Sequence, residues 1–273
     1  MRKKHQIDYH DMINESIKIV KKKGIYRYKY IIIDEYQDTS LNKTELIKEI
    51  QKKTNAKLIA VGDDWQSIYG FTGSNLEIFT NFDKNFPKTK IIKLKKTYRN
   101  SKELLKITKK FICKNKNQIY KNLTTKKKNK HPIHIYYYKD KIDEIWDKVL
   151  EKTKEKDLLI LGRNNSDIAK LPKLKDNSKF LTIHKSKGLE SENTIIINLE
   201  NNYNGLPSKI CDSEYLVYVK PKTDNYTYAE ERRLFYVALT RSKNNNYLLV
   251  KKDNPSIFVK ELIRDYSKYI LIN

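Results

Sequence analysis

Short apolar runs recur along the chain, and each is followed by a polar residue or a glycine. They lie at 31–33, 58–61, 158–161, 180–183 and 195–197. The residues that follow them are Asp34, Gly62, Gly162, His184 and Asn198. Continuous apolar runs of this length are typical of strands buried on both faces of a parallel sheet. Such a sheet needs helices on both faces, so this feature favours an α/β architecture.

Segments with helical spacing lie between these runs. Apolar residues recur every three or four positions in 41–53, 101–113 and 230–242. Alternation of strands and helices predicts an α/β fold with mainly parallel sheets, whose ligands bind at the carboxyl ends of the strands.

Two stretches resemble boundaries. Pro87 interrupts the pattern before an expected strand at 91–95, and 114–132 is polar and rich in lysine. We therefore expect one domain over 1–88 and a second over 89–273. The stretch 114–132 is expected to be a short basic insertion, solvated and without a core of its own.

The chain is strongly basic, with 57 Lys and Arg against 33 Asp and Glu and a net charge of +24 over 273 residues. A polyanion is the expected partner, nucleic acid first, although a composition rich in Lys, Asn, Ile and Tyr could account for part of the lysine excess. The 20 Tyr, 8 Phe and 2 Trp argue against disorder. Two cysteines exclude a disulfide scaffold and favour a cytoplasmic setting. No apolar run approaches the ~18–20 residues that cross a bilayer, so no membrane partner is expected.

Adjacent carboxylates follow the first apolar run. Asp34 and Glu35 are placed where an Asp can hold Mg²⁺ through water and a Glu can polarise an attacking water, as in a Walker B site. The alternative is a strand that simply ends in an acidic turn.

The second run leads into a segment rich in glycine and aromatic residues. Gly62 permits a sharp turn, and Gln66 could orient water or sense a phosphate. Tyr69 and Phe71 have the spacing of a platform on which bases stack. Taken alone, such aromatic residues are more often part of a core.

Together these segments resemble the motifs of UvrD/Rep-type superfamily 1 DNA helicases, and Trp65 points to the helicase IV branch. Motifs II to VI of that family resemble, in order, 34–38, 61–69, 96–101, 182–190 and 230–241. The resemblance implies a RecA-like P-loop NTPase fold, with a partial first lobe followed by a complete second lobe. It also implies ATP and Mg²⁺ as cofactors, 3′→5′ movement on single-stranded DNA in repair or replication, and a place near the nucleoid.

The resemblance implies four catalytic positions. Asp34 would hold the Mg²⁺ of MgATP, and Glu35 would be the general base. Gln66 would couple the γ-phosphate to the DNA site, and Arg241 would act on the developing phosphoryl charge like an arginine finger.

The same resemblance implies the nucleotide contacts. Tyr98 would stack on adenine, and Arg99 would reach the γ-phosphate together with Arg241. Gly188 would form a turn, and Glu190 would lie near the ribose or the Mg²⁺.

For DNA, the resemblance implies contacts to the backbone and to the bases of a single strand. Thr182 and His184 would face the DNA backbone, and Tyr69 and Phe71 would stack on bases.

Several of these positions have a structural alternative. Arg232 and Arg233 are better explained as a solvated helix face. Arg241 lies on the same face as Leu234 and Val237, so its charge would point inward and would need an anion such as phosphate. Outside its motif, His184 would be a core histidine. For Trp146, on a helix with Ile142, Ile145 and Val149, core packing is the better interpretation.

A P-loop pattern, Gly-x-x-x-x-Gly-Lys-[Ser/Thr], begins at none of the seven glycines. Three hypotheses follow. The chain could be the later part of a helicase whose P-loop is on a separate polypeptide, a non-catalytic protein that binds single-stranded DNA, or a module with an interaction role only. We expect 1–88 to expose apolar edges and faces where strands of the first lobe are missing, and to be less well ordered than 89–273.

Overall fold

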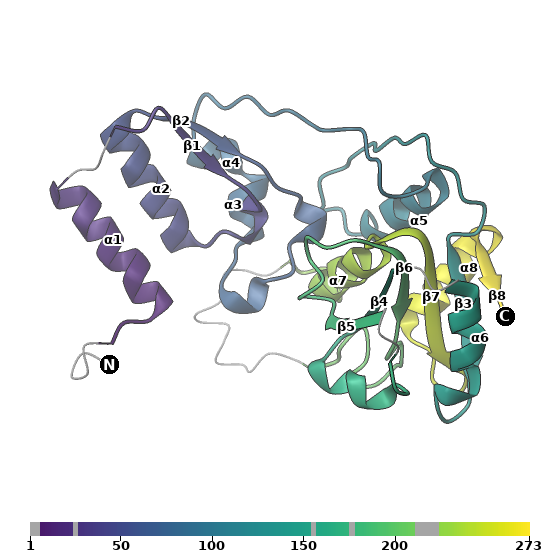
Figure 1. Ribbon diagram of the computed structural model, residues 1–273. Helices are drawn as coiled ribbons and strands as arrows, with labels where there is room; N and C mark the ends of the chain where they lie inside the picture. Colours follow the sequence, from purple (N-terminus) through teal and green to yellow (C-terminus); the bar gives the residue numbers. More distant parts are fainter. Residues whose placement is uncertain (1–5, 24–26, 154–156, 175–177, 211–223) are drawn as a thin grey trace. The chain divides into compact units, whose positions relative to one another are not determined.

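The computed structural model describes residues 6–23, 27–153, 157–174, 178–210 and 224–273 (Figure 1). The chain divides into two compact units, Met1–Ile91 and Ile92–Asn273.

The first unit contains a parallel pair of strands, β1 and β2, with helices before, between and after them. In chain order its elements are α1 (Tyr9–Lys23), β1 (Tyr30–Ile33), η2 (Tyr36–Asp38), α2 (Leu41–Thr54), β2 (Lys57–Ala60), η3 (Asp64–Gln66), η4 (Gly70–Thr72), α3 (Leu76–Thr80) and α4 (Phe82–Asn85). The side chain of Ser40 caps α2 by accepting the N–H of Lys43, and Asn55 ends the helix in the left-handed region.

The two strands of the first unit are buried on one face only. Ile33 and Leu58 pack with Tyr36, Ile78 and Phe86 in the core of this unit. The opposite face carries Tyr30, Ile32, Ile59 and Val61, which are 45–71% exposed. The expectation that 31–33 and 58–61 are buried on both faces is therefore wrong, while the expected apolar exposed face is present. The physical reason is that the helices packed on this pair cover a single side of it.

The second unit is built on a six-stranded sheet of order β5-β4-β6-β7-β3-β8, in which every pair is parallel. In chain order its elements are α5 (Lys102–Ile112), β3 (Ile133–Tyr138), α6 (Asp143–Thr153), β4 (Leu158–Gly162), η5 (Asn165–Lys170), β5 (Ser178–Thr182), β6 (Ser191–Ile196), α7 (Ala229–Leu239), β7 (Ser242–Lys251), α8 (Ile257–Tyr266), η7 (Ser267–Tyr269) and β8 (Ile270–Ile272). The predicted α/β fold with a parallel sheet is confirmed.

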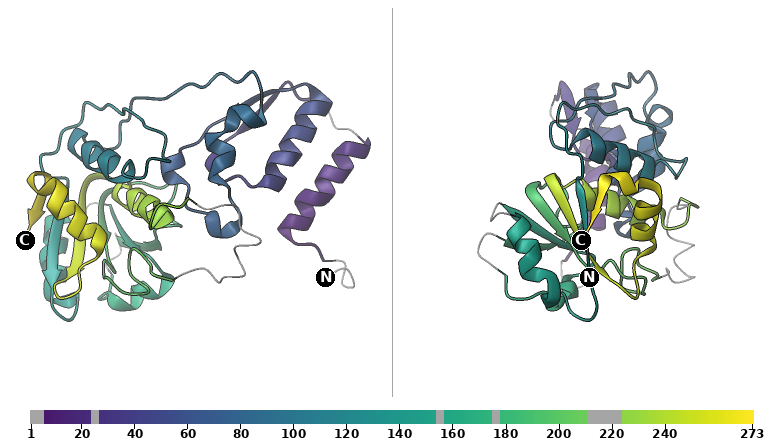
Figure 2. Two further views of the ribbon diagram at one scale, coloured as in Figure 1. Left: turned by 180° about the vertical axis from the view of Figure 1, so that it is seen from behind. Right: turned by 90° about the vertical axis from the view of Figure 1, so that its right-hand side faces the viewer.

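Helices cover both faces of this sheet (Figure 2). On one face α6 contributes Trp146 and Val149 to a core with Ile160, Ile195 and Tyr247, as predicted for Trp146. On the other face α5, α7 and α8 meet through Phe111, Phe235 and Phe258, whose ring centroids lie 5.3–5.7 Å apart. Because strand residues alternate between faces, the central strands are apolar on both, and all five residues of β4 are buried.

The expected strand at 91–95 is absent. The segment forms no strand, and Ile91, Ile92 and Leu94 are 68–78% exposed. Pairing begins only at its end, where the carbonyl of Lys95 accepts the backbone N–H of Thr124 and Lys96 forms an isolated bridge to Thr124. A strand needs a partner for its ladder, and an apolar run alone does not supply one.

The basic stretch 114–132 has no helix or strand, as predicted, but it is not simply solvated. Asn115 is 2% exposed, and its amide donates to Asp224. The backbone N–H of Asn129 donates to Glu103, and its side chain donates to Asn245. These contacts fasten the stretch to the second unit.

Candidate functional site

The acidic residues after β1 stand at the exposed end of the strand. Glu35 adopts a left-handed backbone conformation, with φ 49°, and its N–H donates to Asp34 Oδ1 at 2.8 Å. This turn leaves both carboxylates exposed. The pair is therefore open to an incoming ligand.

Gln37 joins the ends of the two strands. Its Nε2 donates to Glu35 Oε2, and its Oε1 accepts the backbone N–H of Asp63 at 2.9 Å. Asp63 Oδ2 in turn accepts from Gln66 Nε2 at 2.7 Å. Four residues thus form a continuous chain of hydrogen bonds from the carboxylate of Glu35 to the amide of Gln66. Gln37 is fully buried, and it was not among the predicted site residues.

Gly62 leaves room for this arrangement. A Cβ at this position would lie 2.5 Å from Gln37 Oε1 and 2.7 Å from Phe79 Cε2. The backbone N–H of Tyr36 donates to the carbonyl of Val61, immediately before this glycine. Gly62 is therefore required for close approach of the two strand ends, in addition to the turn predicted from the sequence.

Tyr69 and Phe71 lie together, with ring centroids 6.0 Å apart and an angle of 50° between the rings. Phe71 is 60% exposed, which fits a stacking surface better than a core position. Tyr69 is half-buried. Its burial, together with the nearby carboxylates of Asp38 and Glu35, raises the pKa of its hydroxyl.

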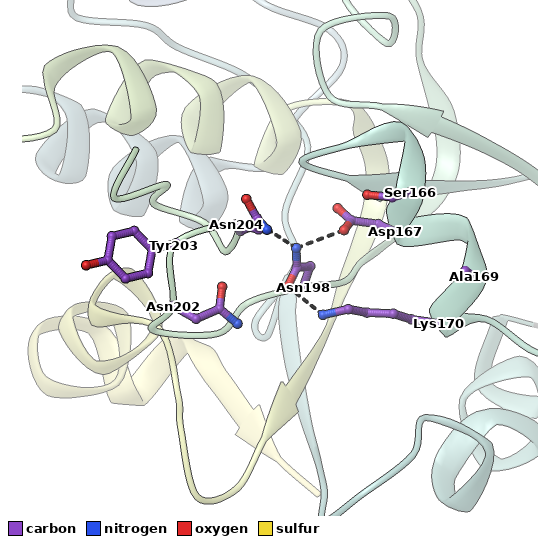
Figure 3. Close-up of a pocket in the computed structure, with 8 residues that line it drawn as sticks. All are labelled: Ser166, Asp167, Ala169, Lys170, Asn198, Asn202, Tyr203 and Asn204. Atoms are coloured by element: carbon purple, nitrogen blue, oxygen red, sulfur yellow. Dashed lines mark hydrogen bonds between the residues drawn. The ribbon is translucent and has the colours of Figure 1, made fainter. Parts of the chain in front are cut away.

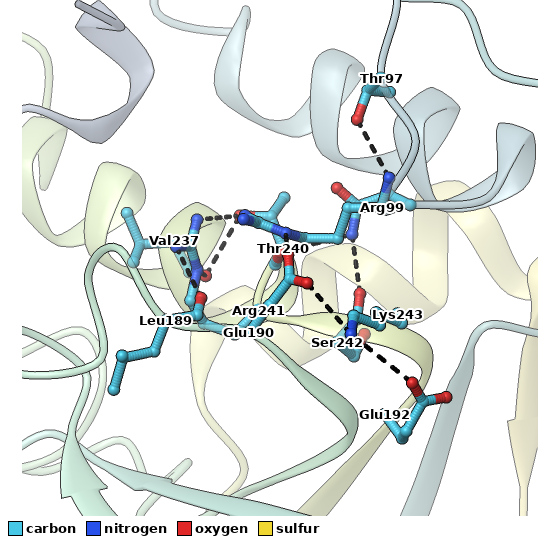
Figure 4. A network of polar contacts seen from close by, with 11 residues as sticks. Thr97, Arg99, Leu189, Glu190, Glu192, Val237, Thr240, Arg241, Ser242 and Lys243 are labelled. Atoms are coloured by element: carbon cyan, nitrogen blue, oxygen red, sulfur yellow. Dashed lines mark hydrogen bonds and ion pairs between the residues drawn. The ribbon is translucent and has the colours of Figure 1, made fainter. Parts of the chain in front are cut away.

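In the second unit, Glu190 is held between two cations (Figure 4). Arg99 Nε lies 2.7 Å from Glu190 Oε2, and Lys243 Nζ lies 3.0 Å from Glu190 Oε1. The hydrogen bonds from Arg99 and Lys243 lower the pKa of Glu190. Two residues predicted to contact nucleotide, 91 positions apart in the chain, are thus in direct contact.

Arg241 is 1% exposed, as its inward-facing position predicted. Its Nε donates to the carbonyl of Val237 and its Nη1 to that of Leu189, each at 3.1 Å, and its Nη2 contacts Thr240 Oγ1 at 3.3 Å (Figure 4). These neutral oxygens bind the guanidinium and fix its position beside Glu190.

The solvated-face interpretation of Arg232 and Arg233 is wrong, because both are 6% exposed. Arg232 donates to both oxygens of Glu261 at 2.9 Å, and its guanidinium carbon lies 4.2 Å from the ring centre of Phe111. Arg233 pairs with Asp224. Other helices and aromatic rings pack around α7, so its polar residues need partners inside the protein.

The remaining predicted positions lie at turns and edges of the second unit. Thr182 is buried at the end of β5, and its Oγ1 accepts the N–H of Lys185 at 3.3 Å. His184 is half-buried in the turn that follows. Gly188 has φ 81°, a conformation that favours glycine. Tyr98 is 78% exposed, with Lys96 Nζ 4.9 Å from its ring centre.

The predicted site residues therefore form separate groups within each unit. Asp34, Glu35 and Gln66 are brought together in the first unit, and Arg99, Glu190 and Arg241 in the second. For Mg²⁺, Asp34 offers one exposed carboxylate, which fits the way this ion binds through one or two carboxylates, waters and substrate phosphates. Within the described ranges no group of three His, Cys, Asp or Glu side chains forms a metal site, and no helix is long and apolar enough to span a membrane.

Comparison with known proteins agrees with this arrangement of motifs. Residues 1–87 match the family model of the UvrD/REP helicase N-terminal domain, and residues 170–253 match that of the UvrD-like helicase C-terminal domain. The chain belongs to the UvrD/Rep helicase family. Glu35 and Gln66 lie in the part of this UvrD/Rep protein that matches the N-terminal domain, and Glu190 and Arg241 in the part that matches the C-terminal domain.

Three similar proteins match this UvrD/Rep chain over different shares of their own length. DNA helicase IV of Escherichia coli K12 is 32% identical over 96% of this chain, and the match covers 40% of that protein. The ATP-dependent DNA helicase Rep of Buchnera aphidicola (Acyrthosiphon pisum) is 33% identical over 72% of this chain and 34% of its own length. The solved C-terminal domain of a possible DNA helicase from Lactobacillus strain WCFS1 has a TM-score of 0.41 and 14% identity, over 65% of this chain and 99% of that one.

Proposed function

We propose that this chain is part of an ATP-dependent DNA helicase that moves 3′→5′ on single-stranded DNA. The observation that carries the proposal is the hydrogen-bonded chain Glu35–Gln37–Asp63–Gln66 in the first unit. It connects the carboxylate suited to activate water with a glutamine three residues before Tyr69, whose ring lies beside that of the exposed Phe71. A change at one end of such a chain alters the position of the other, which is what coupling of hydrolysis to DNA binding requires.

In this proposal Asp34 would hold Mg²⁺ and Glu35 would accept the proton of the attacking water. When bound, Mg²⁺ neutralises charge on the phosphates of ATP. The exposed positions of both carboxylates support these roles.

The second unit would supply cations to the phosphates. Arg99 is paired with Glu190 at 2.7 Å, and Arg241 is fixed by carbonyls beside it. A charged phosphate group is a stronger partner for a guanidinium than either a half-exposed carboxylate or a carbonyl. We therefore expect Arg99 to exchange Glu190 for phosphate when nucleotide binds, with Tyr98 stacked on the base.

The phosphate cradle must come from outside these 273 residues, since none of their seven glycines begins a P-loop pattern. Removing that preorganised set of N–H donors and its lysine would lower the rate of hydrolysis by several orders of magnitude. The proposed activity therefore requires a polypeptide that carries the P-loop.

The missing P-loop pattern also supports a second candidate function, binding of single-stranded DNA without catalysis. Tyr69 and Phe71 would then stack on bases, and Thr182 and His184 would face the DNA backbone. The net charge of +24 favours a polyanion in both cases.

Reconstitution separates the two functions. The chain is mixed with a polypeptide that carries the P-loop part of a UvrD/Rep first lobe, and ATP hydrolysis is measured with and without single-stranded DNA. The helicase proposal predicts DNA-stimulated hydrolysis that Glu35→Gln abolishes and that the control Glu77→Gln, at an exposed glutamate of the same unit, leaves intact. No hydrolysis in the mixture, with DNA bound by this chain alone, would favour the second function.

A further inference from the structure

A crevice in the second unit lies at the point where the sheet topology reverses. From β4 the chain continues to β5 on one side, and from β6, the neighbour of β4, it continues to β7 on the other side. The connections that leave the carboxyl ends of these adjacent strands therefore diverge. In open α/β sheets, ligands bind in the crevice at such a switch point.

A cavity of about 540 Å³ is present at this place, between η5, which follows β4, and the segment 198–204, which follows β6 (Figure 3). Its volume falls within the range of small-ligand sites, roughly 300–1,000 Å³. It is separate in position from Arg99, Glu190 and Arg241, since Glu190 and Arg241 directly precede β6 and β7 and so lie at the amino ends of the strands.

The charged groups of this crevice are already paired. Asp167 is 3% exposed, and its oxygens accept from the backbone N–H of Asn164 at 2.8 Å and from Asn198 Nδ2 at 2.9 Å. Lys170 Nζ lies 2.8 Å from both Asn198 Oδ1 and Glu200 Oε1. With its lysine neutralised internally, the crevice is poorly suited to bind a phosphate.

The groups left for a ligand are an aromatic ring and one side-chain amide. Tyr203 is 73% exposed at the rim, and the side chain of its exposed neighbour Asn204 makes no hydrogen bond within the described part of the chain. Asn202 is not open to a ligand, because its Oδ1 is shielded from solvent and its Nδ2 donates to Glu200 at 3.0 Å. An aromatic ring beside an amide is the combination that stacks on a nucleobase and bonds to its polar edge.

The crevice also adjoins the segment with Thr182 and His184, which is expected to face the backbone of a DNA strand. Thr182 at the end of β5 is paired in register with Gly162 at the end of β4, and Lys185 Nζ donates to Asn165 Oδ1, in η5, at 3.3 Å. A strand that passes Thr182 and His184 would therefore run along the same carboxyl edge of the sheet that contains the crevice.

We propose that the crevice between η5 and 198–204 binds a nucleobase, with Tyr203 as the stacking ring and the side-chain amide of Asn204 as partner of the base edge. The base comes from a single strand of DNA or from a free nucleotide, and experiments distinguish the two sources. The strand source rests on the proposed function, whereas base binding in the crevice does not.

Binding of a base that belongs to a DNA strand is tested with the full chain and an oligonucleotide that carries 2-aminopurine, whose fluorescence falls when it stacks. Tyr203→Ala should weaken binding by about 5- to 150-fold, the range for loss of one base–aromatic stack. Tyr203→Phe should bind like the unchanged chain, because it keeps the ring. Tyr120→Ala, at a 63% exposed tyrosine of the same unit, is the matched control.

Two further measurements show whether Tyr203 acts on a base. The slope of log affinity against log salt should be the same for Tyr203→Ala and the unchanged chain, since a ring displaces no counterions. An oligonucleotide with abasic sites should show no difference between Tyr203→Ala and Tyr120→Ala. Two results would overturn binding of a base from a DNA strand. One is equal affinity of Tyr203→Ala and Tyr120→Ala for the base-containing oligonucleotide. The other is a loss of affinity of Tyr203→Ala for the abasic oligonucleotide that is as large as its loss for the base-containing one.

The free source is tested by saturation-transfer NMR with deoxyadenosine monophosphate, which is independent of strand binding. Saturation transfer to the base protons should be lost in Tyr203→Ala and kept in Tyr203→Phe. This result supports base binding in the crevice even if the unchanged chain binds no DNA and the proposed function fails. Transfer that Tyr203→Ala leaves unchanged, or no transfer together with no effect on the oligonucleotide, overturns the proposal.

Discussion

Gln37 Oε1 accepts the backbone N–H of Asp63 at 2.9 Å, and this hydrogen bond joins the segments that follow β1 and β2. The residues are 26 positions apart, and Gln37 is fully buried. A buried side chain that satisfies a distant backbone group is a positional constraint, because losing it leaves a polar group unpaired.

We therefore predict that Gln37→Ala destabilises the first unit by about 1–3 kcal/mol. The measurement is urea unfolding followed by Trp65 fluorescence in a Trp146→Phe background, so that the only indole is in the first unit. Gln51→Ala, on α2 of the same unit with a single long hydrogen bond of 3.4 Å, is the control. Equal midpoints for the two variants would show that the Gln37 bond contributes no stability.

Gly62→Ala should also destabilise the first unit, by about 1–3 kcal/mol, because the new methyl would lie 2.5 Å from Gln37 Oε1 and 2.7 Å from Phe79 Cε2. The same Trp65 fluorescence assay measures it. Part of the clash involves Gln37, so the double variant Gly62→Ala/Gln37→Ala should lose less than the sum of the single variants. Strict additivity would contradict the contact described here.

Glu261 should give the stability of the second unit a defined dependence on pH. Burial raises the pKa of Glu261, but hydrogen bonds from Arg232 and Lys114 outweigh this, and its pKa lies below its ordinary value of 4.5. A carboxylate with a depressed pKa in the folded state stabilises above its unfolded pKa, and this contribution is lost as the pH falls through the folded pKa.

Accordingly, Glu261→Gln should cost about 1–3 kcal/mol near neutral pH, and the difference from the unchanged chain should shrink as the pH falls below about 4.5. Unfolding is followed by Trp146 fluorescence in a Trp65→Phe background. Glu151→Gln, at an exposed glutamate on α6, should show neither the cost nor the pH dependence. A cost for Glu261→Gln that is constant from pH 3 to pH 7 would contradict the ionic role of this residue.

Phe71→Ala should weaken binding of single-stranded DNA by about 1–3 kcal/mol if its exposed ring stacks on a base. Fluorescence anisotropy of a labelled oligonucleotide measures the affinity, and Tyr9→Ala, at an 86% exposed tyrosine of the same unit, is the control. The slope of log affinity against log salt, roughly −0.7 per phosphate contacted on a single strand, should be the same with and without Phe71. Unchanged affinity would remove Phe71 from the DNA surface.

Apolar runs predicted those strands whose neighbours bury them, such as β4 and β6. The strand β7 was not predicted, although its second half, 247–250, is an apolar run. Its first half, 242–246, is polar, and the buried Asn246 there accepts from Thr194 of β6. The same signal wrongly predicted a strand at 91–95, since the sequence does not show whether a pairing partner exists.

Without the family resemblance, the residues themselves indicate only those parts of the candidate site whose chemistry is local in the chain. Asp34 and Glu35 are adjacent in the chain and follow a strand, so their exposure at its end could be expected. The role of Gln37 depends on Asp63, and the pairing of Arg99 with Glu190 depends on the fold of the whole second unit. The crevice at Tyr203 depends on strand order, which places β4 beside β6 although β5 lies between them in the sequence.

The uncovered side of β1 and β2, with Tyr30, Ile32, Ile59 and Val61, has a consequence for the protein in solution. Copies with a net charge of +24 repel each other in dilute buffer, where the screening length is about 30 Å at 0.01 M salt. At 1 M salt that length is about 3 Å, and the apolar sides of two copies can then meet. Salt that screens this charge should therefore promote self-association, so the solubility of the protein should be greatest at low ionic strength.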